Sequence, residues 1–186
     1  MEASLQLFTG RDDDEVSIRS IAERAGVGVG SLYQYFKTRE GVLDALVDRI
    51  TADNFEAFRR TLEEREDRPL EDVLDAIVEG VIDIYLRRPT LTRVAVRTII
   101  GFRRLDAITR ERDRFVGLLT DRLSRELPHR DRDELSGAAT IVTDMAMGAI
   151  VSQTFRADDP ARVEQIRDAA RRLARAELAR LRAPRE

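Results

Sequence analysis

Cysteine and tryptophan are missing from this chain of 186 residues, and histidine occurs once, as His129. Without cysteine, neither a disulfide framework nor a thiolate metal site can form. His129 lies in the polar turn LPHRDRD, where we interpret it as a surface residue rather than a general base. The acidic run at residues 12–15 lacks the alternating ligands and the glycine of a calcium loop. The sequence therefore predicts no enzyme, no metal site and no cofactor.

Long apolar runs are absent as well. Charged residues make up 36% of the chain, and no stretch approaches 18 consecutive apolar residues, so we expect no membrane-spanning helix. The first residues, MEASLQLF, lack the basic start and the long apolar core of a secretory signal, so the expected location is the cytoplasm. Lysine is nearly absent too. Among 32 basic residues only Lys37 is a lysine, a bias that we interpret as genomic composition.

What the chain does contain is apolar residues spaced three and four apart, with no alternation long enough to predict a strand. An all-α fold is therefore expected. Ser17 should cap a helix that ends at Gly26, and a short helix should follow over 29–36. Thr38 should cap a long helix over 39–64 that carries one continuous apolar stripe.

The remaining helices are expected on either side of a domain boundary near Ile50, within the long helix. This boundary divides the chain into a smaller unit, 1–50, and a larger helical unit, 51–186. Pro69 and Pro89 each open a new helix, and Gly101 interrupts or bends the second. The other expected helices cover residues 2–8, 70–87, 106–127, 133–155 and 161–181.

The two short helices form a predicted helix-turn-helix. Ala22 is small where the helices cross, Gly26 reverses the chain, and Leu32 packs back on the first helix. The second helix of such a motif can enter the major groove of DNA, although an ordinary helical corner has similar spacing. The other residues expected in its small core are Ile18, Ile21 and Val27.

The string IAERAGVGVGSLYQYFKTREGVLDAL resembles the DNA-binding domain of the TetR (tetracycline repressor) family of bacterial transcription regulators. In that family a helix-turn-helix ends in a Leu-Tyr-x-x-Phe run and a basic, polar turn. The similarity covers about residues 5–50, and beyond it only the architecture agrees. It implies an N-terminal three-helix DNA-binding domain and a larger helical domain for ligand binding and dimerisation. The implied function is a homodimeric repressor that binds a palindromic operator in double-stranded DNA and is released by a small-molecule effector.

The resemblance also implies which residues contact DNA. Tyr33 and Tyr35 would direct their hydroxyls at phosphates, although one of them could be a core residue, and Lys37 suits a phosphate clamp. Gln34 could read a base or contact nothing, and Phe36 is expected to anchor the core. The implied contact residues are Ser17, Gly28, Val29, Ser31, Tyr33, Gln34, Tyr35, Lys37 and Thr38.

The sequence departs from the family pattern in three ways. The family's first helix normally starts a turn earlier, after a basic arm, whereas this chain starts within that helix. Gly28 and Val29 replace a polar pair, so direct base hydrogen bonding is sparse and a thymine methyl is the expected partner of Val29. Residues 1–50 carry six basic and nine acidic residues, so any basic surface must be local, with residues 12–15 turned away from the duplex.

Apolar residues of the larger unit could line an effector pocket, although for each residue taken singly an ordinary core position is the favoured interpretation. Asp144 lies among apolar neighbours and is either a polar contact in that pocket or a partly exposed, bonded carboxylate. The candidate ligand residues are Phe58, Tyr85, Ile99, Phe102, Phe115, Asp144 and Met147.

Small and apolar residues on the last two helices are spaced for close helix packing, which favours a four-helix dimer interface. Packing within one subunit would give the same pattern. The candidate interface residues are Ile141, Met145, Gly148, Ser152, Ile166 and Leu173. A helical adaptor that binds no DNA, such as a degenerate regulator without the N-terminal arm, is the alternative function.

Overall fold

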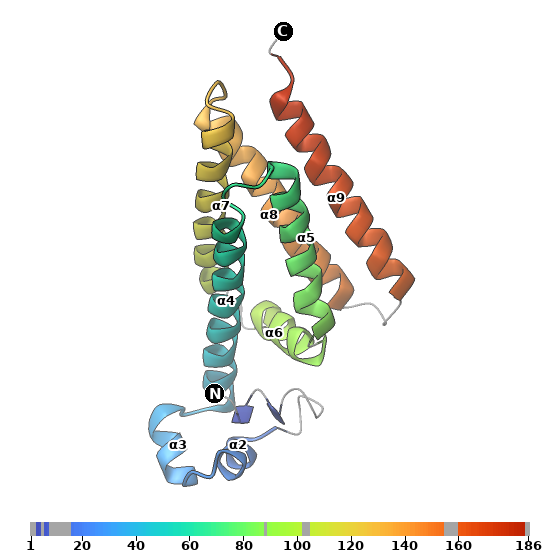
Figure 1. The fold of residues 1–186 in the computed structure, drawn as a ribbon. Coiled ribbons are helices and arrows are strands. Elements are labelled where there is room, and N and C mark those ends of the chain that lie inside the picture. The colour runs from blue at the N-terminus through green and yellow to red at the C-terminus, as the bar shows by residue number, and fades with distance from the viewer. Residues whose placement is uncertain are drawn as a thin grey trace.

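The computed structural model describes residues 3–4, 6–7, 16–87, 89–101, 105–154 and 160–184. Residues 3, 4, 6 and 7 are helical, and the remaining described elements confirm the predicted all-α fold (Figure 1). In the part of the chain that is described, none of the helices is both long and apolar enough to cross a membrane. In chain order the helices are α2 (Ile18–Ala25), α3 (Val29–Tyr35), α4 (Arg39–Glu64), α5 (Leu70–Arg87), α6 (Pro89–Gly101), α7 (Leu105–Glu126), α8 (Arg132–Thr154) and α9 (Pro160–Arg182).

Local hydrogen bonds define the ends of the first helices, as the sequence predicts. The Ser17 side chain accepts a hydrogen bond from the Ser20 backbone N–H at 3.1 Å, and the Ser20 side chain accepts one from the Ser17 N–H at 2.9 Å. Gly26 ends α2 with φ 67°, a left-handed conformation that favours glycine. Thr38 caps α4 by accepting from the Gly41 N–H at 3.1 Å. The chain therefore reverses between α2 and α3, and a new helix, α4, begins directly after Thr38.

Helix α4 contributes to two separate apolar clusters rather than to one continuous core. Its first half buries Val42, Leu43 and Leu46 beneath α2 and α3, whereas its last turns bring Leu62 into the main core of the larger unit. Between these ends, residues 52 and 53 are exposed. In Figure 1, α4 extends from the bundle to the end of the molecule that carries α2 and α3.

The small cluster under the helix-turn-helix lacks one of the residues expected in it. Ile18, Ile21 and Ala22 are buried as predicted, but Val27 is 46% exposed. Residues before and after the motif complete the cluster instead. Helix α4 packs against the helices of the motif, and the turn that contains Val27 lies at the edge of the cluster. The buried members are Val16, Ile18, Ile21, Val42, Leu43, Leu46 and Val94, and Leu7, Leu32, Phe36 and Ile50 pack against them.

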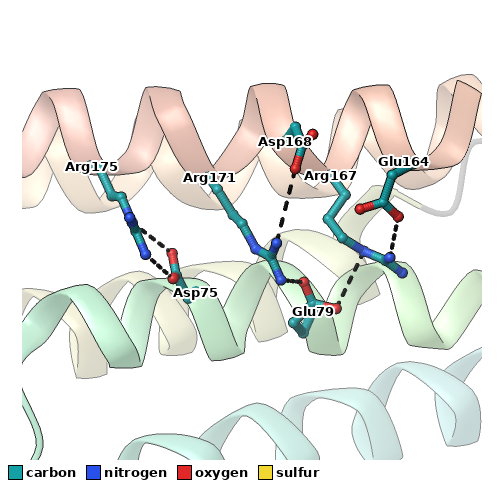
Figure 2. Close-up of polar contacts among 7 residues, drawn as sticks. All are labelled: Asp75, Glu79, Glu164, Arg167, Asp168, Arg171 and Arg175. Atoms are coloured by element: carbon teal, nitrogen blue, oxygen red, sulfur yellow. Dashed lines mark hydrogen bonds and ion pairs between the residues drawn. The ribbon is translucent and has the colours of Figure 1, made fainter.

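Helix α9 is joined to α5 by small buried residues and by a row of ion pairs (Figure 2). Ala170 and Ala174 are buried, which is consistent with close packing of the two helices. Carboxylates of α5 form ion pairs with arginines that recur along α9. The pairs are Arg167 (3.3 Å) and Arg171 with Glu79, Arg175 (3.1 Å) with Asp75, and Arg182 with Glu71.

Candidate nucleic-acid interface

Helix α3 is exposed on most of its circumference. Only Val29 and Leu32, one turn apart, are half-buried. Tyr33 is 47% exposed and Tyr35 is 80% exposed. Neither tyrosine hydroxyl has a hydrogen-bond partner among the described residues. Large aromatic residues in solvent are unusual on a helix that serves packing alone, so α3 is a candidate binding surface. Its other exposed residues are Gly30, Ser31 and Gln34.

The position of α3 depends on the residues at its two ends. Gly28 precedes the helix in an extended conformation, and its carbonyl accepts from the Leu32 N–H at 3.2 Å. Phe36 follows the helix, and its N–H donates to the Leu32 carbonyl at 2.9 Å. The side chains of Leu32 and Phe36 both pack against the small cluster. The predicted core role of Phe36 is thus confirmed, and the opposite face of α3 is left to solvent.

The turn between α3 and α4 carries an exposed cation. Lys37 is exposed, and within the described chain its ammonium group has no hydrogen-bond or ion-pair partner. Thr38, the next residue, is exposed although its hydroxyl caps α4. Ser17 is likewise an exposed cap, at the start of α2. The end of the molecule formed by α2 and α3 (Figure 1) therefore carries exposed hydroxyl residues and the exposed cation of Lys37.

Two arginine contacts that support this end were missed by the sequence analysis. The Arg39 Nε donates to the Val16 carbonyl at 2.8 Å, which ties the start of α4 to the segment before α2. The Arg24 Nε donates to the Gln6 side chain at 3.0 Å. Each bond joins residues that are far apart in sequence, so no local pattern could have revealed it.

Basic and acidic residues are nearly equal in number near the interface, so any basic surface there must be local. Residues 16–50 hold five basic and four acidic residues. Arg19 and Glu23 form an exposed ion pair at 3.2 Å along α2, and Arg24 gives that helix one net positive charge. The prediction that the acidic run at 12–15 turns away from DNA lies outside the described residues.

The predicted ligand residues that fall in described helices come from α4 to α8. Phe58 and Phe115 pack on each other, with ring centroids 5.3 Å apart, and both belong to or contact the main core. Ile99 and Met147 are half-buried on α6 and α8. The side chains of Tyr85 and Phe102 lie outside the described part of the chain.

Asp144 occupies the exposed side of α8 and is bonded to α7. Its side chain is 51% exposed, and the Arg112 Nη2 contacts its Oδ2 at 2.6 Å. The Arg112 guanidinium holds the pKa of the Asp144 carboxyl below its ordinary value, against a smaller opposing effect of burial. Of the two alternatives for this residue, the geometry corresponds to the partly exposed, bonded carboxylate.

A groove of about 610 Å³ lies between the end of α4 and α7, and it contains none of the predicted ligand residues. Its arginines are paired with neighbouring carboxylates: Arg132 contacts Asp121 at 2.6 Å, and Arg59 and Arg125 contact Glu63 and Glu66. The lining is thus charged and internally neutralised, unlike the expected apolar pocket. The lining residues are Arg59, Leu62, Glu63, Glu66, Leu118, Asp121, Arg122, Ser124, Arg125 and Arg132.

Helices α8 and α9 each expose a large apolar side chain. Ile141 is 62% exposed and Leu173 is 58% exposed, and Gly148 is exposed on the same helix as Ile141. Ile166 is half-buried. Met145 is half-buried and packs against two apolar clusters of the same chain. The side chain of Ser152 lies outside the described residues.

Both parts of the chain match families of bacterial regulators. Residues 1–46 match the model described as bacterial regulatory proteins, tetR family, and residues 69–178 match the model described as tetracyclin repressor-like, C-terminal domain. The second match alone spans more than half of the chain.

Individual relatives agree with the family models. The HTH-type transcriptional regulator BetI of Escherichia coli O17:K52:H18 is 25% identical over 163 residues, which cover 82% of this chain and 80% of BetI. A solved TetR-family regulator from Streptomyces coelicolor is 25% identical, with a TM-score of 0.64 and coverage of 97% of this chain and 95% of that one. The regulator PfmR of Thermus thermophilus, at 22% identity, has the same fold, with a TM-score of 0.63 and 96% coverage of each chain.

The helix-turn-helix, the exposed α3 and the helical C-terminal domain are thus the parts of one known architecture, and the chain belongs to the TetR family of bacterial transcription regulators.

Proposed function

We propose that this regulator is a dimeric repressor that binds a palindromic operator through α3 and the turn at residues 36–38, and that a small molecule releases it. The observation that carries the proposal is the exposure of α3. Tyr33 and Tyr35 hold their hydroxyls in solvent, and the ammonium of Lys37 in the following turn has no partner among the described residues. Such a surface suits a phosphate backbone, which accepts hydrogen bonds and attracts cations.

The exposed residues divide into those that position the protein and those that read bases. Tyr33, Tyr35 and Lys37 contact phosphates, together with Ser17 and Thr38 at the helix starts. Contacts of this kind set register and affinity but carry no sequence information. The start of α3 reads the base sequence. Val29 contacts a thymine methyl, and Ser31 and Gln34 reach base edges, because Gly28 has no side chain and lets the backbone approach the DNA closely.

The dimer forms through α8 and α9. Ile141 and Leu173 are too exposed to contribute to the monomer core, and covering them with the same surface of a second copy removes apolar area from water. Glycines at 137 and 148, with open space where a Cβ would lie, allow close approach on the same helix. In a two-fold dimer the two α3 helices must lie about 34 Å apart, or a multiple of a helical turn, to reach successive major grooves.

Effector binding acts through α4 and α6. We place the domain boundary within α4, near Ile50, so this helix is shared by both domains. Val94 of α6 belongs to the apolar cluster under the helix-turn-helix. A ligand lodged between α4, α5 and α6 therefore tilts α4 and displaces both recognition helices without touching DNA. By linkage, operator DNA then weakens ligand binding by the same factor by which the ligand weakens DNA binding.

A gel-shift titration tests the repressor directly. The DNA is the region upstream of the chain's own coding sequence, and an unrelated duplex of equal length is the control. We expect binding at least about a thousandfold tighter to the upstream region, the usual margin for specific recognition. Equal affinity for both duplexes would contradict operator recognition, and no binding to either would favour the DNA-free adaptor.

A thermal-shift screen identifies the effector class, because a ligand that binds the native state stabilises it by RT ln(1 + [L]/Kd). Any compound that raises the melting temperature is then titrated against free protein and DNA-bound protein. Weaker binding to the complex supports release by ligand, whereas equal affinity would show that the compound's site does not control DNA binding.

A further inference from the structure

Lys37 is the only residue of the sequence with a side-chain amine. The other 31 residues among the 32 lysines and arginines are arginines, whose guanidinium groups stay protonated and resist acylation. Amine-directed chemistry on side chains of this protein is therefore confined to one position. That position lies in the turn between α3 and α4, within the proposed DNA-contact surface.

The surroundings of Lys37 leave its amine accessible. The residue lies outside both helices and is exposed. Among the described residues, no carboxylate or carbonyl pairs with its ammonium group. The arginines of the larger unit contrast with it, since those of α9 that face α5 are held by Asp75 and Glu79 (Figure 2). An unpaired amine on a turn can approach a small electrophile without breaking an existing contact.

We propose that Lys37 is a regulatory acylation site, modified by small acyl donors of the acyl phosphate or acyl thioester class. The ammonium group first gives one proton to water. The neutral amine then attacks the acyl carbonyl carbon, a C–N bond forms, and the bond to the phosphate or thiolate leaving group breaks. The nitrogen loses one proton to the leaving group, and no oxidant or reductant takes part. The product is a neutral amide in place of the ammonium group.

The consequence for DNA binding follows from the lost charge and rests on the function proposed above. An amide cannot replace a condensed counterion at a phosphate, so each modified protomer loses one electrostatic contact. At about 0.1 M salt, the loss of one such contact weakens binding about tenfold, and the salt slope falls by about one unit per protomer. Acylation thus releases the regulator by a route that requires no effector in the C-terminal domain.

The test treats the full-length dimer with acetyl phosphate alone in one arm and with acetyl-CoA alone in the other. Peptide mass spectrometry measures the modified fraction at Lys37 and at the chain's N-terminus. Fluorescence anisotropy measures affinity for the upstream duplex and an unrelated duplex before and after treatment. Lys37→Arg serves as the matched variant, and it is compared only with itself before and after treatment.

We expect modification at Lys37 in at least one arm, with at least tenfold weaker binding to both duplexes, and no change in Lys37→Arg on treatment. Failure to modify Lys37 with either donor would overturn the inference and leave the repressor intact. Modification without weaker binding would overturn it as well. If the untreated protein bound neither duplex, the proposed function itself would fail, which distinguishes that outcome from the other two.

Discussion

Val94 of α6 and Leu43 of α4 belong to the same buried apolar cluster, so a side chain of the C-terminal domain forms part of the core beneath the helix-turn-helix. Val94 is 4% exposed and Leu43 is 2% exposed. A close-packed core transmits displacement because it contains few voids that could absorb it. Movement of α6 therefore changes the support of α2 and α3.

Replacing Val94 with alanine should destabilise the protein, because the change removes two buried methyl groups and leaves a cavity. We expect the free energy of unfolding to fall by about 1–3 kcal/mol in urea titrations. Val27→Ala is the matched control at an exposed position, with an expected change within about 0.5 kcal/mol. Equal effects of the two changes would show that Val94 contributes nothing to the core.

Replacing Lys37 with alanine should weaken DNA binding without changing which sequence is preferred. A phosphate contact supplies charge rather than base information, so the slope of log affinity against log salt should fall by about one unit per protomer. Fluorescence anisotropy at several salt concentrations gives this slope. A changed sequence preference at an unchanged slope would assign Lys37 to base reading instead.

Tyr33→Phe and Tyr35→Phe keep the ring and remove the hydroxyl. Since both hydroxyls lack partners among the described residues, the free energy of unfolding should not change. DNA affinity should drop by about 1 kcal/mol per hydrogen bond lost, as anisotropy titrations would show. If both variants bound DNA as the unmodified protein does, the tyrosines would have no role in phosphate contact.

Ile141→Glu should convert the proposed dimer into monomers, because it replaces an exposed apolar side chain of the proposed interface with a charge. Sedimentation equilibrium measures the dimer dissociation constant. Val27→Glu makes the same change at an exposed apolar residue far from α8 and should leave dimerisation intact. A dimer that survives Ile141→Glu would place the interface elsewhere.

Signals within a few residues of each other predicted most of the fold. Ser17, Gly26 and Thr38 define helix ends through contacts with immediate neighbours, so sequence alone was sufficient for them. Apolar spacing likewise identified the helices, because period 3.6 is a property of one segment. It could not show which cluster each apolar residue would join, and this explains the error at Val27.

Contacts between distant segments escaped the sequence analysis. The bond from Arg39 to the Val16 carbonyl and the pairing of Arg112 with Asp144 join segments that are far apart in sequence, so no local pattern could predict their contact. For the same reason the sequence did not predict that Val94 of α6 would join the cluster beneath the helix-turn-helix. The exposure of α3, in contrast, follows from a family resemblance that rests on contiguous residues, and its DNA contacts remain predictions.

DNase I footprinting of the upstream region most directly tests the account of a dimer that reads DNA through α3. The account predicts two protected half-sites related by a palindrome, with centres about 34 Å apart along the duplex, or a multiple of that helical repeat. Both should lose protection together when Ile141→Glu separates the protomers. A single protected half-site, or no protection at concentrations that saturate the gel shift, would contradict it.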